Sequence, residues 1–405
     1  SWRPNTRAAG VTLEPLAPWG VVTGDASQSV RARVCGVTKP GASLAITATN
    51  TLGQTASIPA VPMDTSGFWQ HDIPLQDPIA KPFGMLRVEA HVEDADGNLC
   101  SNPCETLLAR APEPLPGPMP QSYFGVHVLL RDPDLEAVSR LGYKWCRIHD
   151  ASCITKWGYI EPEPGQWRWH DDEVALARAH GLSILGMLDT APAWETGATD
   201  TGYFQPCHAP KDLAKWRNYV HMVTGHYAGA IDEWEVWNEP WDMKRFFQDG
   251  TPMLYVRLLQ AAYEEAKAAN PNAIIVGIDT YPPLWENAIL AMGAYPYYDK
   301  LSWHRYDPAM PGRPGDGIAR VAERLEAAQR KKGDPKPILC SEGGPDVGRY
   351  HGSFFSFAEP GLFGPWDEGA DRYSRFILST IAAGNERYIA FSVHAAPRHG
   401  WLTHN

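Results

Sequence analysis

The chain has 405 residues, of which 44% are hydrophobic and 20% are charged, and its formal net charge at pH 7 is -11. This length exceeds what one hydrophobic core usually serves, so we expect two domains. No apolar run approaches the roughly 20 residues of a membrane-spanning helix, and a negative charge without a basic block disfavours nucleic acid, so the sequence predicts neither a membrane nor a nucleic-acid partner.

The first part of the chain, residues 1–110, consists of short segments in which apolar and polar residues alternate. Examples are residues 29–37 (SVRARVCGV) and 43–50 (SLAITATN), and turn residues such as Gly, Pro, Asp and Asn separate them. Alternation with a period of two, bounded by turn residues, is typical of strands with one buried face. We therefore expect residues 1–110 to form a small all-β sandwich that serves as an accessory domain.

Three of the seven cysteines, Cys35, Cys100 and Cys104, lie in this first domain. A bridge from Cys35 to one of the other two would suit an exported protein, and buried thiols are the alternative. No signal peptide is visible at Ser1, where a mature chain would begin. On these indirect grounds we expect a secreted or periplasmic protein, and the sequence leaves the oligomeric state open.

Residues 111–120 (APEPLPGPMP) carry five prolines. Proline removes backbone donors and stiffens the chain, which is typical of a linker between folded units. We therefore predict a linker over residues 111–120 and a second domain over residues 121–405.

The second domain alternates short apolar runs with helical patterns. The apolar runs are residues 123–130, 144–150, 183–189, 233–240, 273–279, 300–308, 337–344 and 387–395. Strands that alternate with helices form a parallel sheet whose two faces are buried, and eight such units close into a (β/α)8 TIM barrel, an α/β fold. The chain ends at Asn405, shortly after the last run, so the barrel is expected to lack its last helix.

The active site of such a barrel lies at the C-terminal ends of the strands, where polar residues become functional candidates. The candidates are His127, Arg147, His149, Asp150, Asp189, Asn238, Glu239, Asp279, His304, Tyr306, Glu342 and His394.

Two of these strand ends carry a glutamate, Glu239 on the fourth strand and Glu342 on the seventh. The two strands lie across a closed barrel, so their ends converge over its mouth. Retaining glycosidases need two carboxyl groups about 5 to 5.5 Å apart, one acting as acid and base and the other as nucleophile. Trp237 and Trp241 beside Glu239 would disfavour its ionised form, as an acid requires. We therefore predict Glu239 as the acid/base and Glu342 as the nucleophile.

The motif EVWNEP at residues 235–240, followed by SEGG at residues 341–344, resembles clan A of the glycoside hydrolases. The segments CRIHD, IEPEPGQWRW and SWHRY, at residues 146–150, 160–169 and 302–306, are most similar to family 39 and its neighbours. The EPEPG segment also occurs in families 35 and 42. The resemblance covers residues 123–394 and none of the first 110.

This resemblance implies roles for the residues around the two glutamates. Asn238 would hydrogen-bond the sugar 2-hydroxyl, Arg147 would orient Glu342, and Tyr306 would donate a hydrogen bond to Glu342. His304 would line the substrate site. The clan commonly has a tryptophan at the end of the eighth strand, whereas residues 391–394 of this chain read FSVH, so the identity of the sugar stays open.

Aromatic and histidine side chains near the strand ends allow two interpretations. Trp157, Trp194 and Trp241 follow the second, third and fourth strands in loops, where they would either stack on sugar rings or cover the barrel edge. His149, like His304, would either hydrogen-bond sugar hydroxyls or pack inside the barrel.

Two other assignments compete with the predicted pair. Glu233 and Glu235 share the strand face of Glu239, but deeper glutamates are better explained as partners of an inward arginine or lysine. The four strand-end histidines could suggest a metal, but a metal-dependent barrel would be expected to show closely paired histidines on one strand or a carboxylate at the eighth strand. We therefore predict neither a metal nor another cofactor.

The sequence thus predicts a retaining glycoside hydrolase that cleaves β-glycosidic bonds in an oligo- or polysaccharide by double displacement. A non-catalytic glycan-binding barrel and a transglycosylase with the same covalent intermediate are the alternatives. The sugar, the linkage and the choice between internal and terminal cleavage stay open.

Overall fold

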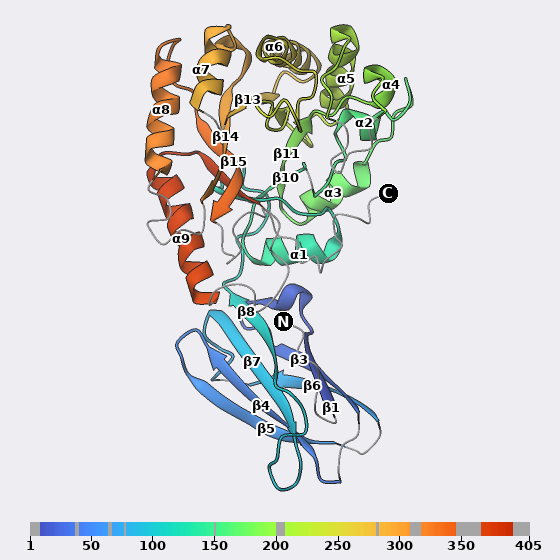
Figure 1. Cartoon of the computed structure of the whole chain (residues 1–405), viewed down its shortest axis with the longest axis vertical. Helices are drawn as coiled ribbons and strands as arrows, with labels where there is room; N and C mark the ends of the chain where they lie inside the picture. The colour runs from blue at the N-terminus through green and yellow to red at the C-terminus, as the bar shows by residue number, and fades with distance from the viewer. Residues whose placement is uncertain are drawn as a thin grey trace. The chain divides into compact units, whose positions relative to one another are not determined.

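The computed structural model describes most of the chain (Figure 1). The described residues are 9–36, 40–63, 67–76, 78–149, 151–199, 207–280, 283–307, 317–345 and 366–391. Contacts divide the chain into two compact units, the first comprising Ser1–Pro116 with Asp132–Gly142 and the second comprising Gly117–Arg131 with Tyr143–Asn405. The chain passes from the first unit to the second between Pro116 and Gly117, inside the proline-rich segment.

The first unit contains two β-sheets, as the alternating pattern predicted. One sheet has the order β1 (Ala9–Pro15), β3 (Gln28–Gly36), β6 (Phe68–Leu75). The other has the order β2 (Val21–Thr23), β8 (Cys104–Ala111), β7 (Gly84–Glu93), β4 (Ser43–Asn50), β5 (Thr55–Pro62). Neighbouring strands are antiparallel except for the parallel pair of β2 and β8.

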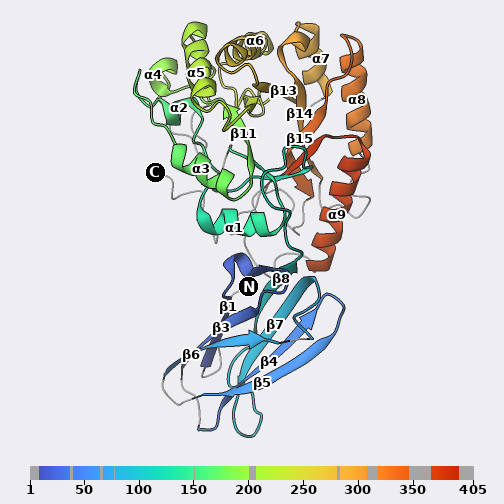
Figure 2. The same cartoon turned by 180° about the vertical axis from the view of Figure 1, so that it is seen from behind.

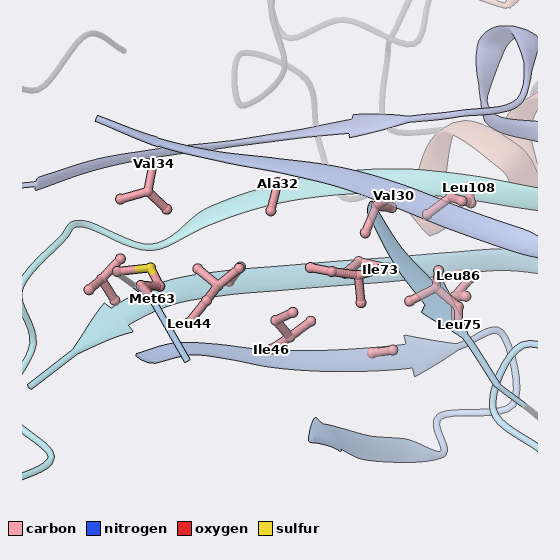
Figure 3. Packing of buried hydrophobic residues seen from close by; sticks show 14 of the residues in the cluster. Val30, Ala32, Val34, Leu44, Ile46, Met63, Ile73, Leu75, Leu86 and Leu108 are labelled. Carbon is pink, nitrogen blue, oxygen red and sulfur yellow. The ribbon is translucent and has the colours of Figure 1, made fainter. Parts of the chain in front are cut away.

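The core of this unit is built by every second residue of its strands. Val30, Ala32 and Val34 of β3 are buried together with Leu44 and Ile46 of β4, and their side chains share one apolar layer (Figure 3). The residues between them on β3 and β4 are more exposed, which is the period expected of a strand with one buried face. All seven cysteines of the chain are free thiols, so the disulfide considered from the sequence is not formed.

A short 3-10 helix, η1 (Pro18–Gly20), and the helix α1 (Asp132–Arg140) also belong to the first unit. The guanidinium of Arg140 donates a hydrogen bond of 2.7 Å to the carbonyl of Val21 on β2. The helix that follows the first barrel strand in sequence is therefore attached by its last turn to the sandwich unit.

The second unit is a closed barrel of parallel strands, which confirms the predicted TIM-barrel fold. Its strands, in chain order, are β9 (Phe124–Val126), β10 (Trp145–Arg147), β11 (Ser183–Leu188), β12 (Glu233–Val236), β13 (Ile274–Thr280), β14 (Lys300–Asp307), β15 (Ile338–Pro345) and β16 (Arg387–Ala390). The last strand pairs with the first, which closes the barrel.

The helices of this unit lie on the outside of the barrel (Figures 1 and 2). They are α2 (Trp157–Ile160), α3 (Asp171–Ala179), α4 (Ala193–Thr196), α5 (Leu213–His226), α6 (Pro252–Ala269), α7 (Pro283–Ala291), the 3-10 helix η2 (Tyr295–Tyr297), α8 (Ile318–Arg330) and α9 (Trp366–Ala382). The segment after the eighth strand, where a last helix was expected to be missing and where His394 lies, is outside the described residues.

The start of α6 illustrates how local sequence sets an element. The hydroxyl of Thr251 accepts a hydrogen bond from the backbone N–H of Leu254, and Pro252 occupies the first turn, where its missing N–H costs nothing. In the described part of the chain, no helix is both long and apolar enough to cross a membrane.

The two deeper glutamates of β12 pair with arginine and lysine side chains, as predicted. Glu233 accepts hydrogen bonds of 2.6 Å from Arg387 and 3.0 Å from Lys300, and Glu235 accepts one of 2.6 Å from Arg147. Since a buried carboxylate without a partner is costly, these ion pairs explain why glutamates are tolerated inside the barrel.

Candidate active site

Glu239 follows β12 at the C-terminal end of the barrel, in a strained turn. The φ angles of Trp237 and Glu239 are 67° and 46°, and those of Ile278 and Asp279 on the neighbouring strand are 77° and 41°. Residues with side chains adopt positive φ only when the surroundings hold them there, and such positions gather at functional sites. Here the backbone N–H of Glu239 donates a 2.5 Å hydrogen bond to Oδ2 of Asp279, which fixes the turn.

Glu342 lies near the end of β15, directly after a register shift. Trp303 of β14 is opposite Cys340, and His304 is opposite Glu342, so Ser341 is an extra residue on β15. An extra residue bends a strand and redirects the side chains that follow it. The hydroxyl of Ser341 then donates a hydrogen bond of 2.7 Å to Glu235 inside the barrel.

Arg147, at the end of β10, connects both glutamate-bearing strands. Its guanidinium donates hydrogen bonds of 2.8 Å to Glu342, 2.6 Å to Glu235 and 2.8 Å to the side-chain oxygen of Asn238. Burial lowers the pKa of Arg147, but the charges of Glu235 and Glu342 outweigh burial and raise the pKa overall. Arg147 is therefore a permanent cation that ties Asn238 to Glu342.

Tyr306 approaches Glu342 from β14. Its hydroxyl donates a hydrogen bond of 2.6 Å to Oε1 of Glu342, while Arg147 binds Oε2. Both oxygens of this carboxylate thus accept a hydrogen bond, which fixes the plane of the group.

His304 lies between three carboxyl groups. Its Nδ1 is 3.0 Å from Oε1 of Glu239 and 4.0 Å from Oε2 of Glu342, and its Nε2 is 3.0 Å from Oδ1 of Asp279. Burial lowers the pKa of His304, but the charges of Asp279 and Glu342 and the hydrogen bonds to Asp279 and Glu239 raise it well above its ordinary value. The raised pKa favours the protonated ring, whose Nδ1 is within hydrogen-bond distance of Glu239 and whose Nε2 faces the charge of Asp279.

The carboxyl groups of Glu239 and Glu342 face each other at short range. One oxygen of each lies within 4.8 Å of the other, and the two residues keep 9% and 7% of their surface exposed. Burial is the largest cause that raises the pKa of Glu239, the negative charges of Glu342 and Asp279 raise it further, and His304 opposes them. The net effect keeps a proton on Glu239 at higher pH than on an ordinary glutamate.

Among the described residues, two groups of side chains place possible ligand atoms close enough to hold a metal ion. They are Glu235, Asp279 and His304, and Glu239, His304 and Glu342. Arg147 forms ion pairs with a carboxylate of each group and would repel a cation, and an imidazolium has no lone pair to offer. The donor set fits an internally neutralised site for proton transfer better than a metal centre.

His149 follows β10 and is buried. Its Nε2 is 3.7 Å from Oδ2 of Asp189, and the ammonium of Lys156 is 3.4 Å from the same oxygen. The structure therefore places His149 in a second polar group at the ends of β10 and β11.

The three loop tryptophans differ in exposure. Trp157 is fully buried, stacks on Tyr219 with ring centroids 5.1 Å apart, and donates its indole N–H to Glu161 at 2.7 Å. Of the two roles that the sequence allowed for Trp157, stacking on a sugar ring is therefore wrong, because the ring has no exposed face. Trp194 and Trp241 are partly exposed and keep surface that a ligand could cover.

Asp279 is the main member of the site for which sequence reasoning gave no role. It is fully buried and contacts both His304 and the backbone of Glu239. Its position at the end of the fifth strand was the only signal in the sequence, and the same rule selected the two glutamates.

Comparison with known proteins relates this barrel to glycoside hydrolases. Residues 149–282 match the model of glycosyl hydrolase family 10. Endo-1,4-beta-xylanases A and C of Phanerodontia chrysosporium are each 30% identical over 131 residues, which is 29% of this chain and 29% and 30% of the xylanases. The matched region thus spans less than a third of these curated relatives.

A solved structure of a family 39 glycoside hydrolase from the gut symbiont Bacteroides cellulosilyticus WH2 has the same fold. It superposes with a TM-score of 0.66 and 17% identity, covering 96% of this chain and 78% of that one. Together with the family 10 match, this likeness confirms the resemblance to clan A glycoside hydrolases that the motifs predicted.

Proposed function

We propose that this chain is a retaining glycoside hydrolase, with Glu239 as the acid/base and Glu342 as the nucleophile. The observation that carries the proposal is the distance between their carboxyl oxygens, within 4.8 Å. Retaining enzymes hold the two carboxyls about 5 to 5.5 Å apart, whereas inverting enzymes leave about 6.5 to 9.5 Å for a water molecule. The likeness to families 10 and 39 supports the same reaction class.

The reaction proceeds in two displacements. First, an oxygen of Glu342 attacks the anomeric carbon, the bond to the leaving oxygen breaks, and Glu239 gives that oxygen its proton. Next, Glu239 as carboxylate takes a proton from water, the water oxygen attacks the anomeric carbon, and Glu342 leaves. Two inversions keep the β configuration, and no cofactor enters either step.

The charges of the site suit both halves of this cycle. Burial and, to a smaller extent, the charge of Glu342 raise the pKa of Glu239, which favours the protonated acid that the first step needs. Once Glu342 is esterified to the sugar, that charge is gone and the pKa of Glu239 falls, which prepares it to act as a base. Arg147 and Tyr306, bound to both oxygens of Glu342, hold the nucleophile in its attacking orientation.

The substrate is a β-linked oligo- or polysaccharide. Asn238 is held by Arg147 beside Glu342, where its amide N–H can meet the sugar 2-hydroxyl. His149 offers a hydrogen bond to a hydroxyl, His304 lies beside both glutamates with its ring nitrogens next to Glu239 and Asp279, and Trp194 and Trp241 offer ring faces to pyranose rings. The curated relatives are named endo-1,4-beta-xylanases, so xylan belongs among the first polymers to test. A polymeric substrate also fits a secreted or periplasmic location.

Two other functions use the same barrel. A non-catalytic glycan-binding protein has no need for a strained turn and buried cations around two facing carboxyls, so the site geometry favours an enzyme. A transglycosylase would share the covalent intermediate and differ only in which acceptor, sugar or water, takes the glycosyl group.

The test is a screen of nitrophenyl β-glycosides together with xylan and other plant, algal and microbial polysaccharides, with products separated by chromatography. We expect turnover in which the first-formed product, monitored by NMR, has the β configuration. Glu342→Gln should abolish turnover while ligand binding persists. Glu264→Gln, which removes an exposed ion pair with Arg217 on the barrel's outer surface, is the matched control. Unchanged turnover in Glu342→Gln, or a first-formed α product, would reject the assignment.

A further inference from the structure

The backbone that carries Glu342 is held by hydrogen bonds to three consecutive carbonyl groups. Nε2 of His127 donates to the carbonyl of Ser341 at 3.2 Å, and the thiol of Cys340 donates to the carbonyl of Glu342 at 3.4 Å. The carbonyl of Gly343 accepts two hydrogen bonds, from the hydroxyl of Tyr388 at 2.9 Å and from the backbone N–H of Phe391 at 3.0 Å.

The strand pairing of this stretch is irregular, because the pairing with β14 skips Ser341 and resumes at Glu342, where β15 no longer pairs with β16. The pairing of β15 with β16 ends at Cys340 and Tyr388, and Ser341 is the extra residue of the register shift with β14. A bulged strand lacks the regular cross-strand bonds that would otherwise set side-chain direction. The hydrogen bonds to the carbonyls on either side of Glu342 therefore add to the resumed pairing with β14, and to the bonds from Arg147 and Tyr306, in fixing the direction of Glu342.

The backbone after Glu342 is also tightly confined. Gly343 has a φ angle of 155°, and a Cβ added there would lie 2.1 Å from the carbonyl oxygen of Arg305. The chain thus passes directly against β14. The carbonyl of Gly343 points toward β16, where the hydroxyl of Tyr388 donates a hydrogen bond to it.

We propose that His127 and Tyr388 are positioning residues for the nucleophile, which act on Glu342 through the carbonyls of Ser341 and Gly343. Both side chains are fully buried or nearly so, at 0% and 1% exposure; His127 directly follows β9 and Tyr388 lies on β16, and these two strands close the barrel. This inference rests on the proposed function, since it concerns the direction of attack by Glu342.

Tyr143 provides a matched control for Tyr388. Its hydroxyl lies in the same cluster of tyrosines, 3.0 Å from the hydroxyl of Tyr373, and so bonds to Tyr373 and not to the segment around Glu342. Tyr143→Phe and Tyr388→Phe therefore remove the same atom from the same neighbourhood, and only the second removes a bond to the Glu342 segment.

The first measurement is the rate at which a 2-deoxy-2-fluoro β-glycoside with a good leaving group labels Glu342, since labelling reports the attack step alone. A misplacement on the order of 1 Å can cost a hundredfold in rate, so Tyr388→Phe should label about 10- to 100-fold more slowly than wild type, with little change in KM. Tyr143→Phe should label at nearly the wild-type rate. His127→Gln, which keeps an N–H donor, should retain more activity than His127→Ala.

A second measurement separates positioning from general damage. In Glu342→Ala, added azide can take the place of the carboxylate and attack the anomeric carbon while the aryl group leaves. Tyr388→Phe in this background has no nucleophile to position, so the azide-dependent rate should stay unchanged.

Equal loss with and without Glu342, or equal labelling rates for Tyr388→Phe and Tyr143→Phe, would overturn the inference while leaving the proposed function intact. A wild-type protein that neither turns over nor becomes labelled on any glycoside would overturn the proposed function, and this inference with it.

Discussion

Nδ1 of His304 lies 3.0 Å from Oε1 of Glu239, so a buried cation touches the carboxyl group that is to carry a proton. This contact opposes the other influences on Glu239, because burial and the charges of Glu342 and Asp279 raise its pKa while His304 lowers it. The pKa of Glu239 is therefore raised, but less than burial and the two neighbouring carboxylates alone would raise it.

The first prediction concerns pH. The acid must be protonated, so kcat/KM should be lost as pH rises through the raised pKa of Glu239. His304→Asn removes the cation that lowers this pKa, and the basic limb of the profile should therefore move to higher pH. His221→Asn, at an exposed histidine paired with Glu265, should leave the limb in place. A basic limb that moves to lower pH in His304→Asn would contradict the electrostatic assignment.

The second prediction concerns the leaving group. Glu239→Ala should reduce hydrolysis of substrates with poor leaving groups by about 10² to 10⁴, since proton donation is worth that much. A dinitrophenyl glycoside needs no protonation, so its first step should survive and a burst of phenolate should precede slow release of the sugar. Azide should speed the slow phase. Equal losses for both kinds of substrate would argue against Glu239 as the acid.

The third prediction concerns the buried partner of Arg147. Glu235→Gln removes one of the two carboxylates that neutralise this fully buried guanidinium. Removing one partner of a buried ion pair costs about 3 to 5 kcal/mol, so urea unfolding should show a loss of that size. Glu264→Gln breaks an exposed pair with Arg217 and should cost under about 1 kcal/mol. Similar losses in the two variants would show that Arg147 is compensated in some other way.

The fourth prediction separates two tryptophans that look alike in the sequence. Trp157→Phe leaves the buried Glu161 without its indole donor, so it should lower the free energy of unfolding by about 1 to 3 kcal/mol and leave KM unchanged. Trp194 is partly exposed, with its indole N–H bound to the carbonyl of Glu161, and Trp194→Ala should raise KM with a smaller effect on stability. Thermal unfolding and steady-state kinetics of both variants check this, and a raised KM in Trp157→Phe would refute the core assignment.

The sequence by itself determined the architecture. Alternation with a period of two marked the sandwich strands around Val30 and Leu44, and eight buried runs separated by helical patterns predicted the closed barrel. It also placed Glu239 and Glu342 at the same edge of the barrel, because the carboxyl ends of parallel strands converge there whatever the intervening loops do. Even the ion pairs of Glu233 and Glu235 followed from the cost of burying an unpaired charge.

Only the tertiary structure decided how these side chains meet. The extra residue Ser341 bends the strand that carries Glu342, and no local pattern signals a bulge whose carbonyls accept hydrogen bonds from His127 and Tyr388, far away in the sequence. The burial of Trp157 and the partnership of Asp279 with His304 likewise depend on segments far apart in the chain. A repeating pattern reports which face of a strand is buried, whereas distances, pKa values and open ring faces arise from contacts between strands, and these exist only once the barrel has closed.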